Sequence, residues 1–102
     1  MKEIKTREEL KEALNRTRSI VMFGKADCLH CTIVRNCIES VEKYYPLIDF
    51  YFTENRDFSK ARNISSFPVV VFYENGIEQG TMIGSNHITL IRDILNLWFK
   101  KD

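Results

Sequence analysis

The chain has 102 residues, of which 44% are hydrophobic and 28% are charged, and its formal net charge is +1. This balance is typical of one globular domain over residues 1–102 and excludes an intrinsically disordered chain. A charge so close to zero creates no field that would attract nucleic acid or an anionic lipid surface, so we expect neither as a partner. The longest strongly apolar run, residues 67–73, is far too short to cross a bilayer.

Three cysteines are present, and two of them, Cys28 and Cys31, are separated by only two residues. This pattern differs from the even, dispersed cysteines of secreted disulfide frameworks. The first residues are charged, and no apolar segment of a signal peptide follows them. We therefore expect a cytoplasmic protein in which the close pair is catalytic or metal-binding rather than structural.

The predicted elements alternate in type, which is typical of an α/β protein whose sheet is covered by helices. A short strand is predicted at residues 2–4. Thr6 and Glu9 match a capping box, which predicts a helix that extends to about Asn15. Residues 19–24 are almost continuously apolar, and this predicts a strand that is buried on both faces.

A long helix is predicted directly after the close cysteine pair. Its apolar side chains recur with helical spacing to about Tyr44, and Pro46 ends it. The members of this apolar stripe are Ile33, Val34, Cys37, Ile38 and Val41. Residues 48–53 are rich in aromatic and β-forming side chains and predict a strand. Residues 55–63 are polar and mixed, which predicts a loop with one or two helical turns.

The C-terminal third predicts a hairpin and a final helix. Residues 68–73 form a strand, and Asn75-Gly76 is the preferred two-residue turn, so residues 77–82 should pair antiparallel with that strand. Ser85 or Asn86 would then cap the helix. The side chains expected on its apolar face are Ile88, Ile91, Leu95 and Trp98, with Ile94 beside them.

Three motifs occur in an order that is specific to one fold. Cys28-Leu29-His30-Cys31 follows a buried strand and opens a helix, Ile64-Ser65-Ser66-Phe67-Pro68 precedes another strand, and the Asn75-Gly76 hairpin is followed by Gly84 and an amphipathic helix. In this combination the chain resembles the thioredoxin family over nearly its whole length. The resemblance implies the thioredoxin fold, an α/β architecture with a central mixed sheet of four or five strands and helices on both faces. It also implies a cis-proline at Pro68.

The resemblance further implies a thiol–disulfide oxidoreductase that acts on protein disulfides. A thiolate is the nucleophile in this chemistry, and a helix N-terminus lowers the pKa of a thiol from about 8.5. Cys28 at the helix start is the expected nucleophile, and Cys31, one turn further on the same face, would resolve the mixed disulfide. We expect a monomer without a cofactor, reduced by an unidentified thiol or disulfide reductase.

The residues around the dithiol depart from the usual thioredoxin pattern. His30 occupies a spacer position where protein disulfide isomerases also have histidine, and an imidazole beside the Cys28 thiolate stabilises the reduced state. We therefore hypothesise a reduction potential above that of ordinary thioredoxins. Asp27 replaces the family's tryptophan, and its carboxylate would partly oppose His30. Met22 replaces the family's buried acid, which helps to deprotonate the resolving cysteine, and methionine cannot accept a proton.

Three further residues are expected to contact the substrate. By the family resemblance, Pro68 would lie beside the dithiol, where backbone atoms around Phe67 would pair with an extended substrate, and Leu29 lies in the spacer between the cysteines. Phe67 would either pack against substrate or cover the core, and the sequence does not decide between the two. Cys37 lies six residues beyond Cys31, which is about 9 Å along a helix and too far for a disulfide. We therefore assign Cys37 to the core.

Two alternatives to catalysis remain at this point. The first is a binding or accessory module that uses the fold as a scaffold with little redox turnover, and the departures at Met22 and Asp27 favour it. The second is a metal site, which ranks lower because a structural zinc site needs four ligands. No second Cys-x-x-Cys motif exists, and beyond the dithiol only His30, Cys37 and His87 could contribute ligands. We therefore expect no metal.

Overall fold

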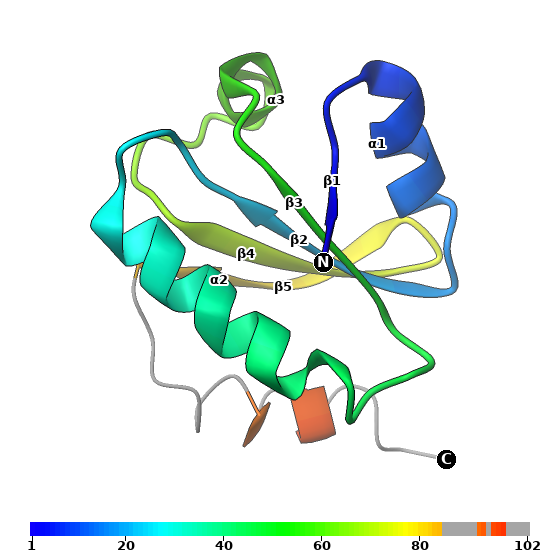
Figure 1. Ribbon diagram of the computed structural model, residues 1–102. Helices are drawn as coiled ribbons and strands as arrows, with labels where there is room; N and C mark the ends of the chain where they lie inside the picture. Colours follow the sequence, from blue (N-terminus) through cyan, green and yellow to red (C-terminus); the bar gives the residue numbers. More distant parts are fainter. Residues whose placement is uncertain (85–91, 94, 98–102) are drawn as a thin grey trace.

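The computed structural model describes residues 1–84, 92, 93 and 95–97. Its strands form one mixed sheet in the order β1-β3-β2-β4-β5 (Figure 1). Both β1 and β2 run parallel to β3, whereas β4 runs antiparallel to both β2 and β5. The strand bounds are β1 (Lys2–Glu3), β2 (Arg18–Phe23), β3 (Asp49–Thr53), β4 (Val69–Glu74) and β5 (Ile77–Ile83). The strands predicted from the sequence are therefore confirmed, with small changes at their ends.

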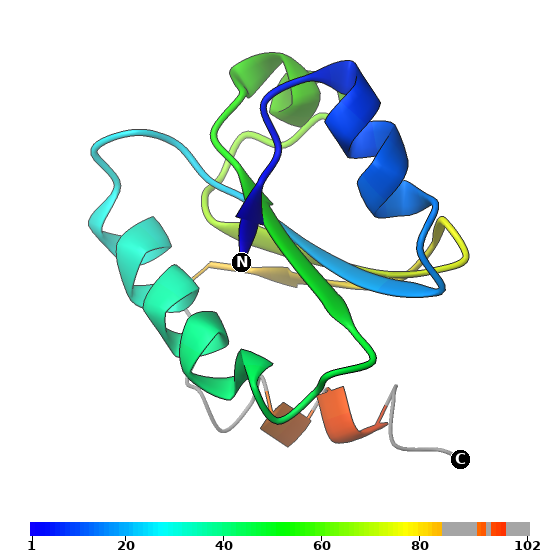
Figure 2. The same ribbon diagram turned by 45° about the vertical axis from the view of Figure 1, so that its right-hand side comes forward.

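The helices lie on both faces of this sheet, as expected. Helix α2 (Leu29–Glu42) covers one face, and α1 (Arg7–Leu14) and α3 (Arg56–Ala61) cover the other (Figures 1 and 2). Successive side chains of a strand point to opposite faces, so β2 contributes to both cores. Ile20 and Met22 pack in the core that contains the buried side chains of α2, and Val21 and Phe23 pack in the core that contains those of α1.

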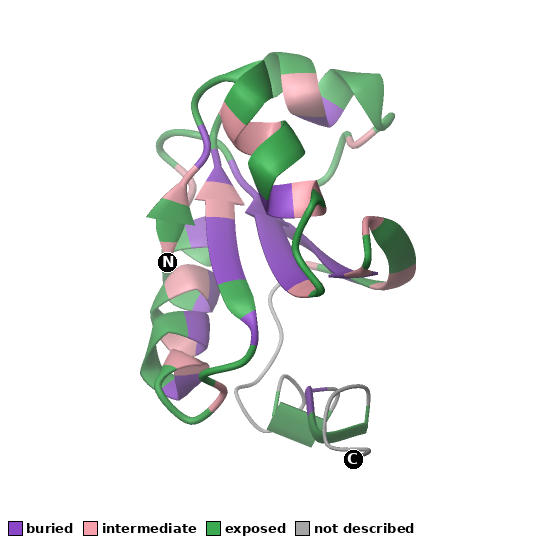
Figure 3. Ribbon diagram, turned by 90° about the vertical axis from the view of Figure 1, so that its right-hand side faces the viewer, coloured by how far each residue is buried: buried purple, intermediate pink, exposed green. Residues whose placement is uncertain are grey.

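The central strand β2 is enclosed on both faces, which accounts for its unbroken apolar sequence. Ser19 and the four residues after it are each at most 2% exposed. Figure 3 shows the buried inner strands between helices whose outer surfaces are exposed. Because β2 is held on both sides by neighbouring strands and on both faces by side chains, the loop that follows it starts from a rigid position.

Helix α1 begins with the predicted capping box. Thr6 Oγ1 accepts a hydrogen bond from the Glu9 amide at 3.2 Å, and the Glu9 carboxylate accepts from the Thr6 amide at 3.0 Å. The same carboxylate also accepts from the Lys5 amide at 2.8 Å. The backbone amides of Lys5 and Thr6 hold the pKa of Glu9 below its usual value of 4.5.

The charge of Glu9 should therefore make stability depend on pH. Because the folded-state pKa is lowered, this contribution is complete above the unfolded-state value and is lost as the pH falls through the folded-state value. We expect the stability advantage of the wild type over Glu9→Gln to be constant at neutral pH and to shrink as the pH falls below the usual value of 4.5. Chemical denaturation at each pH measures this difference. Glu12→Gln, which removes a carboxylate from α1 without touching the cap, should show a smaller change, and equal changes would contradict the assignment.

Helix α2 differs from its prediction in two respects. It ends at Glu42 rather than about Tyr44, because the residue before a proline is disfavoured in helical geometry and Pro46 has no amide hydrogen. Tighter turns follow, in which the Tyr44 amide donates to the Val41 carbonyl at 2.9 Å. In addition, Ile33 was expected on the buried stripe but is 44% exposed. It lies beside the core-facing row of α2 rather than within it.

The predicted hairpin between β4 and β5 is confirmed. Asn75 and Gly76 have φ values of 53° and 79°, the left-handed geometry that a two-residue turn of this kind requires. A register shift at Phe72 and Tyr73 was not predicted. Beyond Gly84, residues 92, 93 and 95–97 are helical.

Leu95 is fully buried in the same core as the apolar side of α2. The remaining residues assigned to the final helix lie outside the described residues, namely Ser85, Asn86, His87, Ile88, Ile91, Ile94 and Trp98. Among the residues that the structure describes, no helix is both long enough and apolar enough to span a membrane.

Candidate active site

The first cysteine of the close pair lies where α2 begins. Cys28 is the N-cap residue, with extended backbone angles of −118° and 106°, and its Sγ atom accepts a hydrogen bond from the Cys31 amide at 3.2 Å. Its carbonyl accepts from the Thr32 amide at 3.1 Å. The amides at a helix start lack partners within the helix and carry the positive end of its dipole. The position therefore stabilises negative charge on the Cys28 sulfur.

The two cysteines are joined in a disulfide in this structure, with their Cα atoms 5.2 Å apart. This separation lies within the normal range for a disulfide. Cys28 is partly exposed, whereas Cys31 is 4% exposed. The Cys28 sulfur can therefore be reached from solvent, whereas Cys31 is almost fully enclosed.

Below Cys31 the site is apolar. Gly24, the residue after β2, lies close to both Cys31 and Met22. A Cβ atom added to it would lie 3.4 Å from the Cys31 Sγ and 3.5 Å from the Met22 Cε. Met22 is 2% exposed and belongs to the core under α2. The position that an acid occupies in the related family is thus filled by a thioether, and no proton acceptor is provided there.

The residues before and between the two cysteines face solvent. Leu29 is 72% exposed, and Asp27 and His30 are also exposed. Asp27 has a φ of 55°, a left-handed conformation that aspartate tolerates better than most residues. This turn redirects the chain from the loop after β2 into α2 and brings Cys28 to the helix start.

The proline expected beside the dithiol lies at the same end of the sheet. Phe23, the last residue of β2, is paired with Val69, the first residue of β4. Since these strands are antiparallel, the loop that leads to Cys28 and the segment that ends at Pro68 lie at the same end of the sheet (Figure 1). The Phe67–Pro68 peptide bond is cis, as predicted, and the Pro68 carbonyl accepts from the Gly84 amide at 2.9 Å.

Two cations over the ring of Phe67, the residue before this proline, were not predicted from the sequence. The Lys25 Nζ atom lies 5.8 Å from the centroid of the Phe67 ring, and the Arg56 guanidinium carbon lies 4.9 Å from it. Phe67 itself is partly buried. These three residues come from three separate segments, so no local pattern could have signalled their contact.

The third cysteine does not join the site. Cys37 is a free, partly buried thiol that packs against the core under α2, in agreement with its assignment. Within residues 1–84, 92, 93 and 95–97, no three side chains of His, Cys, Asp and Glu are grouped as metal ligands would be.

Comparison with known proteins identifies the family. Residues 2–96 match the family model described as Thioredoxin. The chain is 27% identical to Thioredoxin-1 of Saccharomyces cerevisiae over 88 residues, which cover 82% of this chain and 85% of the yeast protein. It is 26% identical to Thioredoxin of Mycoplasma genitalium over 98 residues, which cover 92% of this chain and 96% of that protein.

Solved structures agree with this assignment. The fold is similar to that of Plasmodium falciparum thioredoxin, with a TM-score of 0.87 and 22% identity over 96% of this chain and 99% of the other. A thioredoxin structure from Trypanosoma brucei brucei gives a TM-score of 0.86 at 16% identity, over 97% of this chain and 90% of that one. The predicted thioredoxin fold is therefore confirmed. With its Cys28–Cys31 pair at the start of α2, the chain belongs to the thioredoxin family of protein thiol–disulfide oxidoreductases.

Proposed function

We propose that Cys28 is the attacking thiol and Cys31 the resolving thiol in the exchange of protein disulfides. The Cys28 thiolate attacks one sulfur of the substrate disulfide, a mixed disulfide forms, and the other substrate sulfur leaves as a thiolate that takes up a proton. Cys31, after losing its proton, then attacks the Cys28 Sγ atom and releases the second substrate thiol. Two electrons pass from the dithiol to the substrate, and the Cys28–Cys31 disulfide remains.

One observation carries this assignment of roles. The Cys28 Sγ atom caps α2 and accepts a hydrogen bond from the Cys31 amide, while Cys31 is 4% exposed and its Sγ lies close to Gly24. A cysteine at a helix start is the better nucleophile because its thiolate is stabilised there. Cys31 is buried, and its amide donates to the Cys28 sulfur. Its own sulfur is therefore suited to attack only the mixed disulfide that forms on Cys28.

Reduction of insulin by dithiothreitol, followed as turbidity, tests the proposal. A catalytic dithiol should shorten the lag before precipitation when it is present in small amounts. A protein that uses the fold only as a binding scaffold would leave the lag unchanged, and that result would overturn the proposal. Protein disulfides are the proposed substrates, and a thiol or a disulfide reductase is the proposed electron donor.

His30 is proposed to tune the reduction potential of the pair. A cationic or hydrogen-bonding imidazole beside the thiolate stabilises the reduced form and makes the couple more oxidising. His30→Ala should therefore lower the reduction potential, by roughly 30 mV for each tenfold loss of that stabilisation. Redox titration against glutathione measures the change. An unchanged or higher potential in the variant would refute this role, and Asp27→Asn should move the potential in the opposite direction.

Leu29, Phe67 and Pro68 are proposed to contact the substrate. The exposed Leu29 side chain and the partly buried Phe67 ring support this role, because both lie on segments that emerge at the edge of the sheet where α2 begins. An extended peptide at this edge would place its disulfide next to the exposed side of Cys28.

We further propose a monomeric cytoplasmic protein that forms a single domain over residues 1–102. Its cysteine pattern supports this compartment, since a close redox pair with one extra thiol is typical of reducing environments rather than of secreted frameworks. Sedimentation at several protein concentrations tests the monomer, because a dimer would show a mass that rises with concentration.

A further inference from the structure

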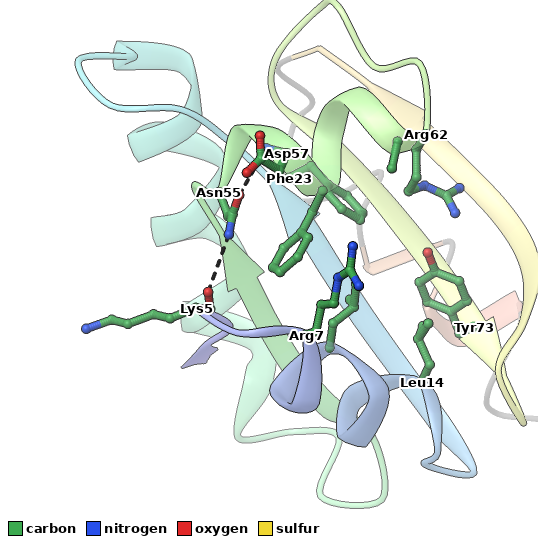
Figure 4. Close-up of a pocket in the computed structure, with 11 residues that line it drawn as sticks. Lys5, Arg7, Leu14, Phe23, Asn55, Asp57, Arg62 and Tyr73 are labelled. Carbon is green, nitrogen blue, oxygen red and sulfur yellow. Dashed lines mark hydrogen bonds between the residues drawn. The ribbon is translucent and has the colours of Figure 1, made fainter.

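A cavity of about 490 Å³ lies between α1 and α3, on the face of the sheet opposite α2 (Figure 4). The exchange of disulfides makes no use of it. Its size is within the range of small-molecule sites, which are typically apolar with a few polar groups that fix orientation. Side chains of α1, α3, β2 and β4 meet there, so each wall is held by a different element.

The floor of the cavity is apolar. Phe23 of β2 is 1% exposed, and Leu10, Leu14 and Phe58 pack against the same core. All four side chains line the cavity. Leu10, Leu14 and Phe58 are partly exposed, so a hydrocarbon body placed against them would remove apolar surface of both partners from water.

A tyrosine hydroxyl in the wall of this cavity is available to a ligand. Tyr73 is 4% exposed and lines the cavity, and its hydroxyl forms no hydrogen bond with any described residue. Figure 4 shows the hydroxyl at the end of the ring that faces Arg62, one of the residues that line the cavity. Burial raises the pKa of Tyr73, so the phenol keeps its proton at neutral pH and can donate it. The hydroxyl keeps access to solvent, so an acceptor on a ligand would take the place of water as its partner.

The rim of the cavity is mainly cationic. Arg7 extends from α1 toward the cavity, and within the described part of the chain it forms no ion pair and no side-chain hydrogen bond (Figure 4). Arg62 lies between the rings of Phe23 and Tyr73, at 5.6 and 5.8 Å from their centroids, and it is paired with Glu78. Lys5, whose Nζ atom lies 3.9 Å from a Glu3 carboxylate oxygen, adds a third positive charge, and Asp57 adds one negative charge. The cation left for a ligand is therefore Arg7.

We infer that the cavity between α1 and α3 binds a small carboxylate with an aromatic or branched aliphatic body. The carboxylate would accept from the Tyr73 hydroxyl and pair with the Arg7 guanidinium, which presents donors suited to two oxygens. The apolar body would lie on the floor formed by Phe23 and its neighbours. This site is independent of the dithiol, because no cavity-lining residue belongs to the Cys28–Cys31 segment.

Titration of the isotope-labelled full chain with hydrocinnamate, followed by amide chemical shifts, tests the inference. We expect saturable shifts at residues that line the cavity. The uncharged analogue hydrocinnamyl alcohol should bind about three- to tenfold more weakly, because it lacks the charged acceptor. Shifts that lie elsewhere, or equal binding of the acid and the alcohol, would overturn the inference.

Two variants and a matched control locate the carboxylate. Arg7→Gln and Tyr73→Phe should each weaken hydrocinnamate by about three- to tenfold, and Arg7→Gln should leave the uncharged alcohol unaffected. Lys11→Gln removes the same charge from the same helix at a position that does not line the cavity, and it should change binding less than twofold. If Arg7→Gln and Lys11→Gln weaken the binding of hydrocinnamate equally, the affinity depends only on the net charge of the protein, and the proposed site is refuted. Tyr73→Phe keeps the ring in the core, so it remains a valid test if Arg7→Gln does not fold.

Discussion

Replacing Cys28 with serine is expected to abolish the reduction of insulin disulfides, with a loss of about three orders of magnitude or more. A serine hydroxyl is essentially never ionised at neutral pH. The start of α2 then has no anion to stabilise, and no sulfur at this position can attack the substrate disulfide. The fold should survive, because serine is itself a favoured N-cap residue. The measurement is the turbidity assay with the variant at the concentration of the wild type.

Replacing Cys31 with serine should give a different failure. The first attack by Cys28 remains possible, but no second sulfur is present to release the substrate, so a mixed disulfide should accumulate. Mass spectrometry of the variant mixed with a disulfide peptide would detect this adduct, and Cys28→Ser should form none. Cys37→Ser is the matched control, since its partly buried thiol packs against the core away from the dithiol. An adduct on Cys31 in the Cys28→Ser protein would reverse the proposed roles.

The sequence predicted those parts of the fold whose signals are local. The capping box at Thr6, the unbroken apolar run of β2 and the Asn75-Gly76 turn each report on a few consecutive residues, and each is confirmed. Helix caps and tight turns are determined by hydrogen bonds and backbone angles of adjacent residues, so they can be predicted without the rest of the chain. The position of Cys28 at the start of α2 was predictable for the same reason.

Features that depend on packing between distant segments were not predictable in this way. Periodicity placed Ile33 on the buried face of α2, but the helix turns that side chain toward solvent at 44% exposure. The contacts of Lys25 and Arg56 with Phe67 join residues more than ten positions apart. Only the assembled fold brings such residues together, because they lie in two loops and at the start of α3.

The cavity between α1 and α3 illustrates the same limit. Phe23 and Tyr73 read as ordinary core residues of two strands, and nothing near either one in the sequence indicates an open space. The space lies where side chains of α1 and α3 meet those of β2 and β4 without filling the volume between them (Figure 4). A hydroxyl without a partner becomes visible only when all of its neighbours are known.

The largest effect on stability is expected from Gly76→Ala in the hairpin between β4 and β5. Gly76 has a φ of 79°, and a Cβ atom there would lie 2.8 Å from the Leu14 carbonyl oxygen. That oxygen belongs to the backbone at the end of α1 and cannot move aside like a flexible side chain. The substitution therefore combines left-handed strain with displacement of either the turn or α1, and we expect a loss of about 2–4 kcal/mol.

Gly84→Ala separates the two causes. Gly84 has a φ of 84°, nearly the same strain, but a Cβ atom added to it would meet no atom of the described residues within 4 Å. Its loss should be close to the cost of left-handed backbone alone, about 1 kcal/mol. Urea unfolding of both variants gives the difference, which measures the contact between the hairpin and α1. If both alanines cost the same, α1 does not press on the turn, and its last residue, Leu14, is not held against the hairpin as the structure has it.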